Sequence, residues 1–116
     1  MIMEIRIIDQ SISQAELEKL AEETFGDMIK GVVDVEKGVM ALGGELHADA
    51  EALLLENGSN QQSLWGINIL PQKPKEDRIE FTSLINIRPS RGYRSMEIED
   101  EEIKEKIKNI IDGLID

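Results

Sequence analysis

The chain has 116 residues, with 24 acidic and 13 basic side chains and a formal net charge of −11 at pH 7. This length fits one domain, placed at residues 1–116, and excludes two independent enzymatic domains. The negative charge repels phosphate backbones and anionic membranes, so we expect neither broad nucleic-acid binding nor membrane association. The absence of cysteine excludes disulfides and thiol nucleophiles. Without a secretion signal or a long apolar run, the sequence predicts a cytoplasmic protein.

The N-terminal part predicts a strand followed by a helix. Residues 2–8 are rich in β-branched side chains, which favour a strand. Ser13 is suited to cap the next helix, and Glu16, three residues later, is suited to complete a capping box. Apolar side chains then recur every three or four residues and predict one buried helical stripe. The expected stripe is Leu17, Leu20, Ala21, Thr24, Phe25 and Met28.

The middle of the chain predicts a hairpin and an element of ambiguous type. Residues 32–35 and 39–42 flank Gly38, which predicts a tight turn with a positive φ at that glycine. Residues 45–56 alternate like a strand but consist mainly of strong helix formers. Both alternatives fit this segment, and we prefer the helix. Asn57 and Gly58 are typical of its end.

The last third predicts two strands and a helix. Residues 64–70 favour a strand with Trp65, Ile67 and Ile69 on one face. Residues 79–88 alternate with a period of two, which predicts an antiparallel partner strand. We expect its inward side chains to be Ile79, Phe81, Ser83, Ile85 and Ile87, and Asn86 and Arg88 to point outward. Asp100 then begins an amphipathic helix with the stripe Ile103, Ile107, Ile110, Ile111 and Leu114.

Together these elements predict an α+β fold. We expect an antiparallel sheet of about four or five strands, with the N-terminal and C-terminal amphipathic helices on one face.

His47 is the only histidine and therefore the only candidate imidazole base or ligand. With Asp49 and Glu51 it forms a candidate catalytic group, or part of a divalent-metal site, whether the segment is helical or extended. A catalytic zinc site normally has three protein ligands, and no second histidine is present, so the sequence does not identify which metal would bind. The alternative is that His47 is hydrogen-bonded at the helix start and that both acids favour the helix dipole.

Three arginines lie within seven residues in the loop 88–95. Arg88, Ser90, Arg91 and Arg94 form a candidate anion-binding site, because guanidinium groups bind phosphates and carboxylates. The alternative is that these arginines pair with the acidic residues 97–101. Trp65 and Tyr93 are candidate interface anchors, with burial of Trp65 in the core as the alternative.

Three segments resemble a family of small prokaryotic proteins catalogued as a domain of unknown function. They are residues 43–49 (GGELHAD), 64–68 (LWGIN) and 85–90 (INIRPS). The resemblance implies a stand-alone cytoplasmic protein and assigns no activity, cofactor or catalytic residue. Function must therefore be argued from the site itself.

Two functional hypotheses follow. The first is a binding or assembly module without a cofactor, which self-associates through a sheet edge or the Trp65 region and has a small anion as a further possible ligand. The second is a small hydrolase or metal-dependent enzyme, in which His47 acts with Asp49 or Glu51 while the arginine loop holds an anionic substrate. The second hypothesis requires the two regions to converge.

Overall fold

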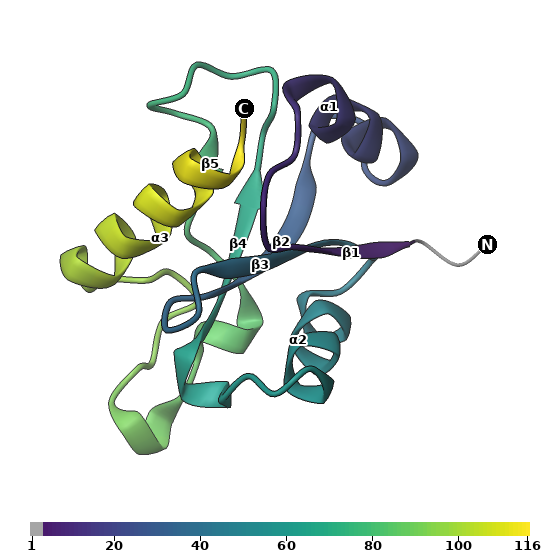
Figure 1. Cartoon of the computed structure of the whole chain (residues 1–116). Helices are drawn as coiled ribbons and strands as arrows, with labels where there is room; N and C mark the ends of the chain where they lie inside the picture. The colour runs from purple at the N-terminus through teal and green to yellow at the C-terminus, as the bar shows by residue number, and fades with distance from the viewer. Residues whose placement is uncertain (1–3) are drawn as a thin grey trace.

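The computed structural model describes residues 4–116, which form a five-stranded antiparallel sheet with three α-helices (Figure 1). The strands are β1 (Ile5–Ile8), β2 (Ile29–Asp34), β3 (Val39–Gly43), β4 (Leu64–Ile69) and β5 (Ile79–Glu80). They lie in the order β1-β3-β2-β4-β5. The helices are α1 (Gln14–Glu23), α2 (His47–Glu56) and α3 (Glu101–Leu114). This confirms the predicted α+β class and antiparallel sheet. The expected first strand began at residue 2, and residues 2 and 3 lie outside the described part.

The β2–β3 hairpin forms the centre of the sheet. Gly38 has φ +71°, as predicted, and its N–H donates to the carbonyl of Asp34 at 2.9 Å. The buried Asp34 carboxylate stabilises this turn, because its Oδ1 accepts hydrogen bonds from the N–H groups of Glu36 and Lys37, both at 2.9 Å. Its Oδ2 accepts from the Ser59 hydroxyl at 2.6 Å. One carboxylate therefore joins the hairpin to the segment before β4.

Side chains alternate between the two faces of the sheet and build two apolar clusters. The larger cluster joins strand residues such as Met40 and Ile67 to side chains of α1 and α3. The smaller one joins Val32 and Ala41 to Ala50 and Leu54 of α2. Figure 1 accordingly shows α1 and α3 above the sheet and α2 below it. The molecule thus has a helix layer on each side of the sheet.

Local capping explains where the helices begin. Ser13 and Glu16 form the predicted capping box of α1, and Asp100 accepts hydrogen bonds from Glu102 and Ile103 at the start of α3. Residues 47–56 are helical, which confirms the preferred alternative for that segment. No helix within residues 4–116 combines the length and apolarity needed to cross a membrane.

The first predicted helix is too long. In the structure α1 ends at Glu23, and the Thr24 hydroxyl donates to the Leu20 carbonyl at 2.9 Å. Gly26 then takes φ +92°, which directs the chain out of the helix. Phe25, expected in the buried stripe, is therefore 40% exposed.

The strand predicted at residues 79–88 is wrong beyond Glu80. Pairing with β4 ends at Asn68↔Glu80, and the chain then forms short 3₁₀ turns, η2 (Leu84–Asn86) and η3 (Pro89–Arg91). Asn86, expected outside, is 1% exposed and hydrogen-bonds to the backbone of Gly66 in β4. Ile87, expected inside, is 37% exposed. A buried carboxamide therefore replaces strand pairing at this edge.

Candidate functional site

The arginine loop and the segment before β4 line an open hollow of about 370 Å³. Its lining consists of Asn60, Gln61, Gln62, Arg88 and Arg91. Two guanidinium groups and three carboxamides thus meet there, with no acidic side chain among the lining residues. Arginine forks and amide N–H groups are donors that suit phosphate or carboxylate oxygens. We call this hollow the arginine pocket.

One wall of the arginine pocket is held by the central hairpin. Val35 donates its N–H to the carbonyl of Ser63 at 3.0 Å, and the Ser63 hydroxyl donates to Glu36 at 3.0 Å. The bond between Ser59 and Asp34 fixes the other end of the same segment. Residues 60–62 are therefore anchored on both sides, while their own side chains are exposed.

Arg88 forms the inner wall of the pocket. Its guanidinium stacks 4.8 Å from the centre of the Trp65 ring and donates hydrogen bonds to the carbonyls of Leu64 and Ile85. Its Nη1 is buried and has no hydrogen-bond partner among the described residues. Burial lowers the pKa of this guanidinium, and the negative charge of Glu51 opposes that shift. Arginine remains charged at neutral pH, so Arg88 is a fixed cation beside the pocket.

The rest of the arginine loop is a small closed turn. Arg88 and Tyr93 exchange backbone hydrogen bonds of 2.6 and 3.1 Å, and Gly92 supplies the required left-handed conformation at φ +87°. Arg91 donates to the Gln62 carbonyl at 3.3 Å and lies over the Tyr93 ring. Ser90 and Arg94 are exposed and do not belong to the pocket lining. Two of the four predicted anion-binding residues therefore share the pocket.

Trp65 and Tyr93 are in contact, and most of the Trp65 side chain is buried in the core. Their rings meet edge to face, with centroids 5.0 Å apart. Trp65 is only 3% exposed and belongs to the larger apolar cluster, whereas Tyr93 is half-buried. Trp65 therefore positions Arg88 and Tyr93 and leaves little of its own surface for a partner.

His47 occupies the first turn of α2 and bonds to β4. Its Nε2 lies 2.9 Å from the Ile67 carbonyl and 3.0 Å from Asn68 Oδ1. Both oxygens are acceptors, so Nε2 carries the proton. The Asn68 side chain in turn donates from Nδ2 to the Glu80 carboxylate at 3.3 Å. Burial lowers the pKa of the imidazole, and the positive charge of Lys30 lowers it further, while the two hydrogen bonds oppose the shift. His47 is therefore a neutral donor near pH 7.

The other two predicted catalytic residues do not gather around His47. Asp49 is exposed, and Glu51 is half-buried, with a negative charge that opposes the lowering of the Arg88 pKa. Among residues 4–116, no three acidic or histidine side chains form a group suited to a metal ion. His47 contacts β4 at Ile67 and Arg88 contacts it at Leu64, about 10 Å apart along the strand.

Sequence reasoning missed the amide half of the arginine pocket. The site residues proposed from the sequence did not include Asn60, Gln61 or Gln62. Three consecutive carboxamides next to a strand were an available signal. Their convergence with Arg91 depends on contacts between segments almost 30 residues apart, which local patterns do not encode.

Comparison with known proteins places the chain in one family. It belongs to the family described as protein of unknown function (DUF5674), whose model matches residues 6–114. This confirms the resemblance to a domain of unknown function over nearly the whole chain. No curated protein and no solved structure matches the chain.

Proposed function

We propose that this protein is a binding module that holds a small anion in the arginine pocket. The observation that carries the proposal is the meeting of Arg88 and Arg91 with the carboxamides of residues 60–62 around one hollow of about 370 Å³. The net charge of −11 works against long polyanions, so a ligand with one phosphate or carboxylate group fits better than a nucleic acid.

Two further hollows of the described chain support this choice by contrast. A hollow of about 310 Å³ beside β1 is lined by three glutamates as well as Arg6 and Lys19. A hollow of about 420 Å³ beside α3 has Glu101 and Glu105 together with Lys104 and Lys108. Their cations have acidic neighbours that neutralise them. The arginine pocket combines cations with uncharged donors, which favours an anionic ligand.

The test is a calorimetric titration of the full chain with inorganic phosphate, compared between two arginine variants. Arg91→Gln removes a pocket guanidinium, and we expect it to weaken phosphate binding about tenfold or more. Arg94→Gln changes the net charge equally but lies outside the pocket lining, so we expect less than about a threefold loss. Arg88 is a poorer choice for substitution because it also packs on Trp65.

Two outcomes contradict the proposal. One is a wild-type chain that binds neither phosphate nor a small carboxylate such as acetate at about 10 mM, a concentration at which even weak sites fill. The other is an equal effect of both arginine variants, which indicates general charge attraction to the loop. Acetate and phosphate also serve as separate arms, because they distinguish the two anion chemistries.

A hydrolase is the second candidate, and it is favoured by the negative charge of Glu51, which acts on the Arg88 guanidinium. In this alternative the arginine pocket holds an anionic substrate while His47 or Glu51 acts as base. If the wild type hydrolyses a simple phosphate ester and His47→Gln does not, the protein is a hydrolase rather than a binding module. The bond of Nε2 to the Ile67 carbonyl favours a structural role for His47 instead.

Self-association is the assembly part of the proposal. The observation behind it is that β1 lies at the end of the sheet and pairs only with β3 among the described strands. Edge strands present unpaired backbone groups to a second chain. Sedimentation velocity measures this directly, with a concentration-dependent dimer as the expected result.

A further inference from the structure

We propose that exposed apolar side chains extend the arginine pocket into a docking surface for a short acidic segment of another protein. The surface consists of Leu84, Ile87, Arg91, Arg94 and Met96, and we call it the apolar–arginine surface. Carboxylates of the partner segment bind the two arginines, and its apolar side chains cover the other three residues. This inference rests on the proposed anion binding and names the class of partner that supplies the anion.

The apolar part of the surface comes from η2 and the segment beside it. Leu84 is 69% exposed, the highest value among the large apolar side chains of residues 4–116. The Ile87 N–H donates to the Leu84 carbonyl at 3.1 Å, and side chains three residues apart in such a turn lie on the same side. The Met96 carbonyl accepts from the Ser83 N–H at 3.0 Å, which places the exposed Met96 beside η2. Exposed apolar side chains that gather in this way mark interaction sites.

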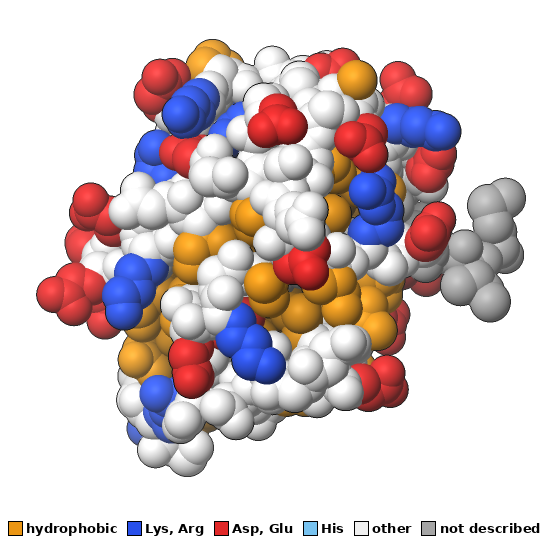
Figure 2. Space-filling model, in the orientation of Figure 1, with side chains coloured by type: hydrophobic (Ala, Val, Ile, Leu, Met, Phe, Trp, Pro, Cys, Tyr) orange, Lys and Arg blue, Asp and Glu red, His pale blue; other side chains and the backbone are white. Residues whose placement is uncertain are grey.

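The basic part of the surface follows directly in the chain. Arg88 donates to backbone carbonyls, so Arg91 and Arg94 are the exposed cations of the loop. The antiparallel bridge between Arg88 and Tyr93 brings the residues that flank it, Ile87 and Arg94, to neighbouring positions. Figure 2 shows hydrophobic side chains next to basic ones at the lower left, over the loop drawn in light green in Figure 1. Apolar and cationic groups therefore share one surface.

The chain does not neutralise these cations. Residues 81–96 contain three arginines and no acidic side chain, although the whole chain has 24 acidic side chains. Neither Arg91 nor Arg94 forms an ion pair within residues 4–116. The loop is thus a positive region on a negative protein, and its charge complements an acidic partner.

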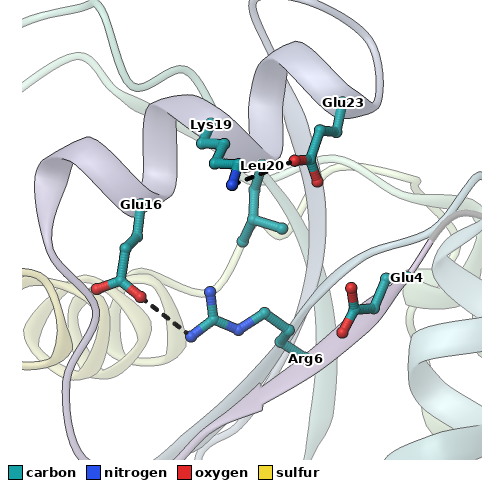
Figure 3. A pocket seen from close by; sticks show the side chains of 6 residues that line it. All are labelled: Glu4, Arg6, Glu16, Lys19, Leu20 and Glu23. Atoms are coloured by element: carbon teal, nitrogen blue, oxygen red, sulfur yellow. Dashed lines mark hydrogen bonds and ion pairs between the residues drawn. The ribbon is translucent and has the colours of Figure 1, made fainter.

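The hollow beside β1 is the contrasting case. Figure 3 shows Arg6 directed toward Glu16 and Lys19 directed toward Glu23. These two ion pairs have distances of 3.4 and 4.0 Å. The cations of that hollow already have carboxylate partners within the chain, whereas those of the apolar–arginine surface can accept carboxylates from another protein.

The charge of the rest of the chain favours a short protein segment as the partner. At 150 mM salt the Debye length is about 8 Å, so a ligand confined to the loop interacts mainly with the arginines. A nucleic acid or an anionic membrane extends further and also meets the acidic groups that give the chain its net charge of −11. Neither of those partners explains the exposed Leu84 as well as apolar side chains of a peptide do.

The surface is held in place before a partner binds. Asn86 is buried beneath η2, and its Nδ2 donates to the carbonyls of Gly66 and Met96, both at 3.0 Å. The side chain of Asn86 thus ties both strands of the loop to β4. A surface fixed in this way loses less conformational freedom on binding.

The experiment measures fluorescence anisotropy of a labelled peptide of about eight residues, alternating glutamate and leucine, titrated with the full chain. We expect a dissociation constant of about 100 μM or lower. Two counterpart peptides, one with glutamine for glutamate and one with serine for leucine, should each bind about tenfold more weakly or worse, because each lacks one of the two interactions.

Variants of the chain locate the binding. Leu84→Ser removes an exposed apolar group, so we expect about tenfold weaker peptide binding and unchanged phosphate binding. Arg94→Gln should weaken peptide binding about fivefold, because the peptide reaches beyond the pocket that holds phosphate.

Matched controls change the same residue types elsewhere. Leu46→Ser removes another exposed leucine at the start of α2, and Lys106→Gln removes an exposed positive charge on α3. Both should leave peptide binding within about twofold of the wild type, since distant sites act independently. Circular dichroism melting shows that each variant folds.

The outcomes separate this inference from the anion binding on which it rests. A chain that binds neither phosphate nor the acidic apolar peptide overturns both. A chain that binds phosphate but prefers neither the acidic nor the apolar peptide, or in which Leu84→Ser has no effect on peptide binding, overturns the docking surface alone. Binding to phosphatidylserine vesicles that is lost in Leu84→Ser, without binding of the peptide, would replace the protein partner with a membrane.

Discussion

At the scale of single residues, Gly66 and Asn86 decide how the chain passes the edge of the sheet. A Cβ on Gly66 would lie 2.4 Å from the Cβ of Ser83. Asn86 can approach the same backbone, because its Oδ1 accepts from the Gly66 N–H at 2.8 Å and its Nδ2 donates to the Gly66 carbonyl at 3.0 Å. The glycine thus provides the space, and the asparagine supplies hydrogen bonds in the place of a strand.

This close contact predicts that Gly66→Ala is strongly destabilising. The added methyl group must displace the Ser83 Cβ and the turn that carries it, so we expect a loss of about 2 kcal/mol or more in the free energy of unfolding. Urea unfolding followed by circular dichroism measures the change. The loop that carries Arg88 follows directly, so phosphate binding weakens in the same variant.

Gly113 provides the matched control for that substitution. It lies in α3, and a Cβ there meets no atom within 4 Å. Alanine in a helix is favoured over glycine by about 0.5–1 kcal/mol, so Gly113→Ala stabilises the protein. Equal, small effects at both glycines would show that the contact between Gly66 and Ser83 relaxes easily.

At the scale of elements, His47 connects α2 to β4 through the Ile67 carbonyl and Asn68. The helix has no side-chain cap at its start, since its N-cap residue is Leu46. The imidazole is therefore the polar attachment of this helix terminus to the sheet. A positive charge at that place is unfavourable, because the helix N-terminus is itself electropositive.

The attachment predicts a pH-dependent stability. Burial, with a further contribution from Lys30, lowers the pKa of His47 in the folded chain, whereas the unfolded chain binds the proton near its ordinary pKa of 6.5. The unfolded state therefore takes up the proton first as the pH falls. The free energy of unfolding decreases below about pH 6.5 and stops decreasing below the folded pKa, with a slope of at most about 1.4 kcal/mol per pH unit.

The measurement compares the wild type with His47→Gln by urea unfolding at pH 7.5 and pH 5. Glutamine stays neutral at both values, so the variant loses less stability on acidification, while the carboxylates contribute equally to both proteins. Identical losses would show that His47 titrates alike in the folded and unfolded chains.

Elements also show what the sequence could and could not predict. Helices α1 and α3 were predictable because Ser13, Glu16 and Asp100 cap them through bonds within three residues. The segment 79–88 misled because its alternation of apolar side chains is real, yet Asn86 bonds to Gly66, 20 residues away. The same holds for the arginine pocket. Its two guanidinium groups were predictable because they are close in sequence, whereas its carboxamides are held in place by the contact of Ser59 with Asp34 of the hairpin.

At the scale of the whole molecule, a net charge of −11 is spread over dimensions of 38 × 31 × 23 Å. At 10 mM salt the Debye length is about 30 Å, so most charges on the molecule repel one another. At 150 mM it falls to about 8 Å, and only close neighbours still interact. Self-repulsion destabilises the compact state, so screening should stabilise this protein.

We therefore expect the melting temperature to rise by about 4 °C between 10 and 150 mM sodium chloride, equivalent to roughly 1 kcal/mol for a domain of this size. A triple variant, Glu22→Gln with Glu76→Gln and Glu105→Gln, removes three exposed negative charges and changes the net charge from −11 to −8. It should melt higher at low salt and respond less to added salt. The melting temperature of Arg91→Gln must rise with salt as much as that of the wild type. A smaller rise in this variant would mean that the salt effect comes from chloride bound in the arginine pocket. A melting temperature that falls with salt would mean that exposed pairs such as Arg6–Glu16 outweigh the repulsion.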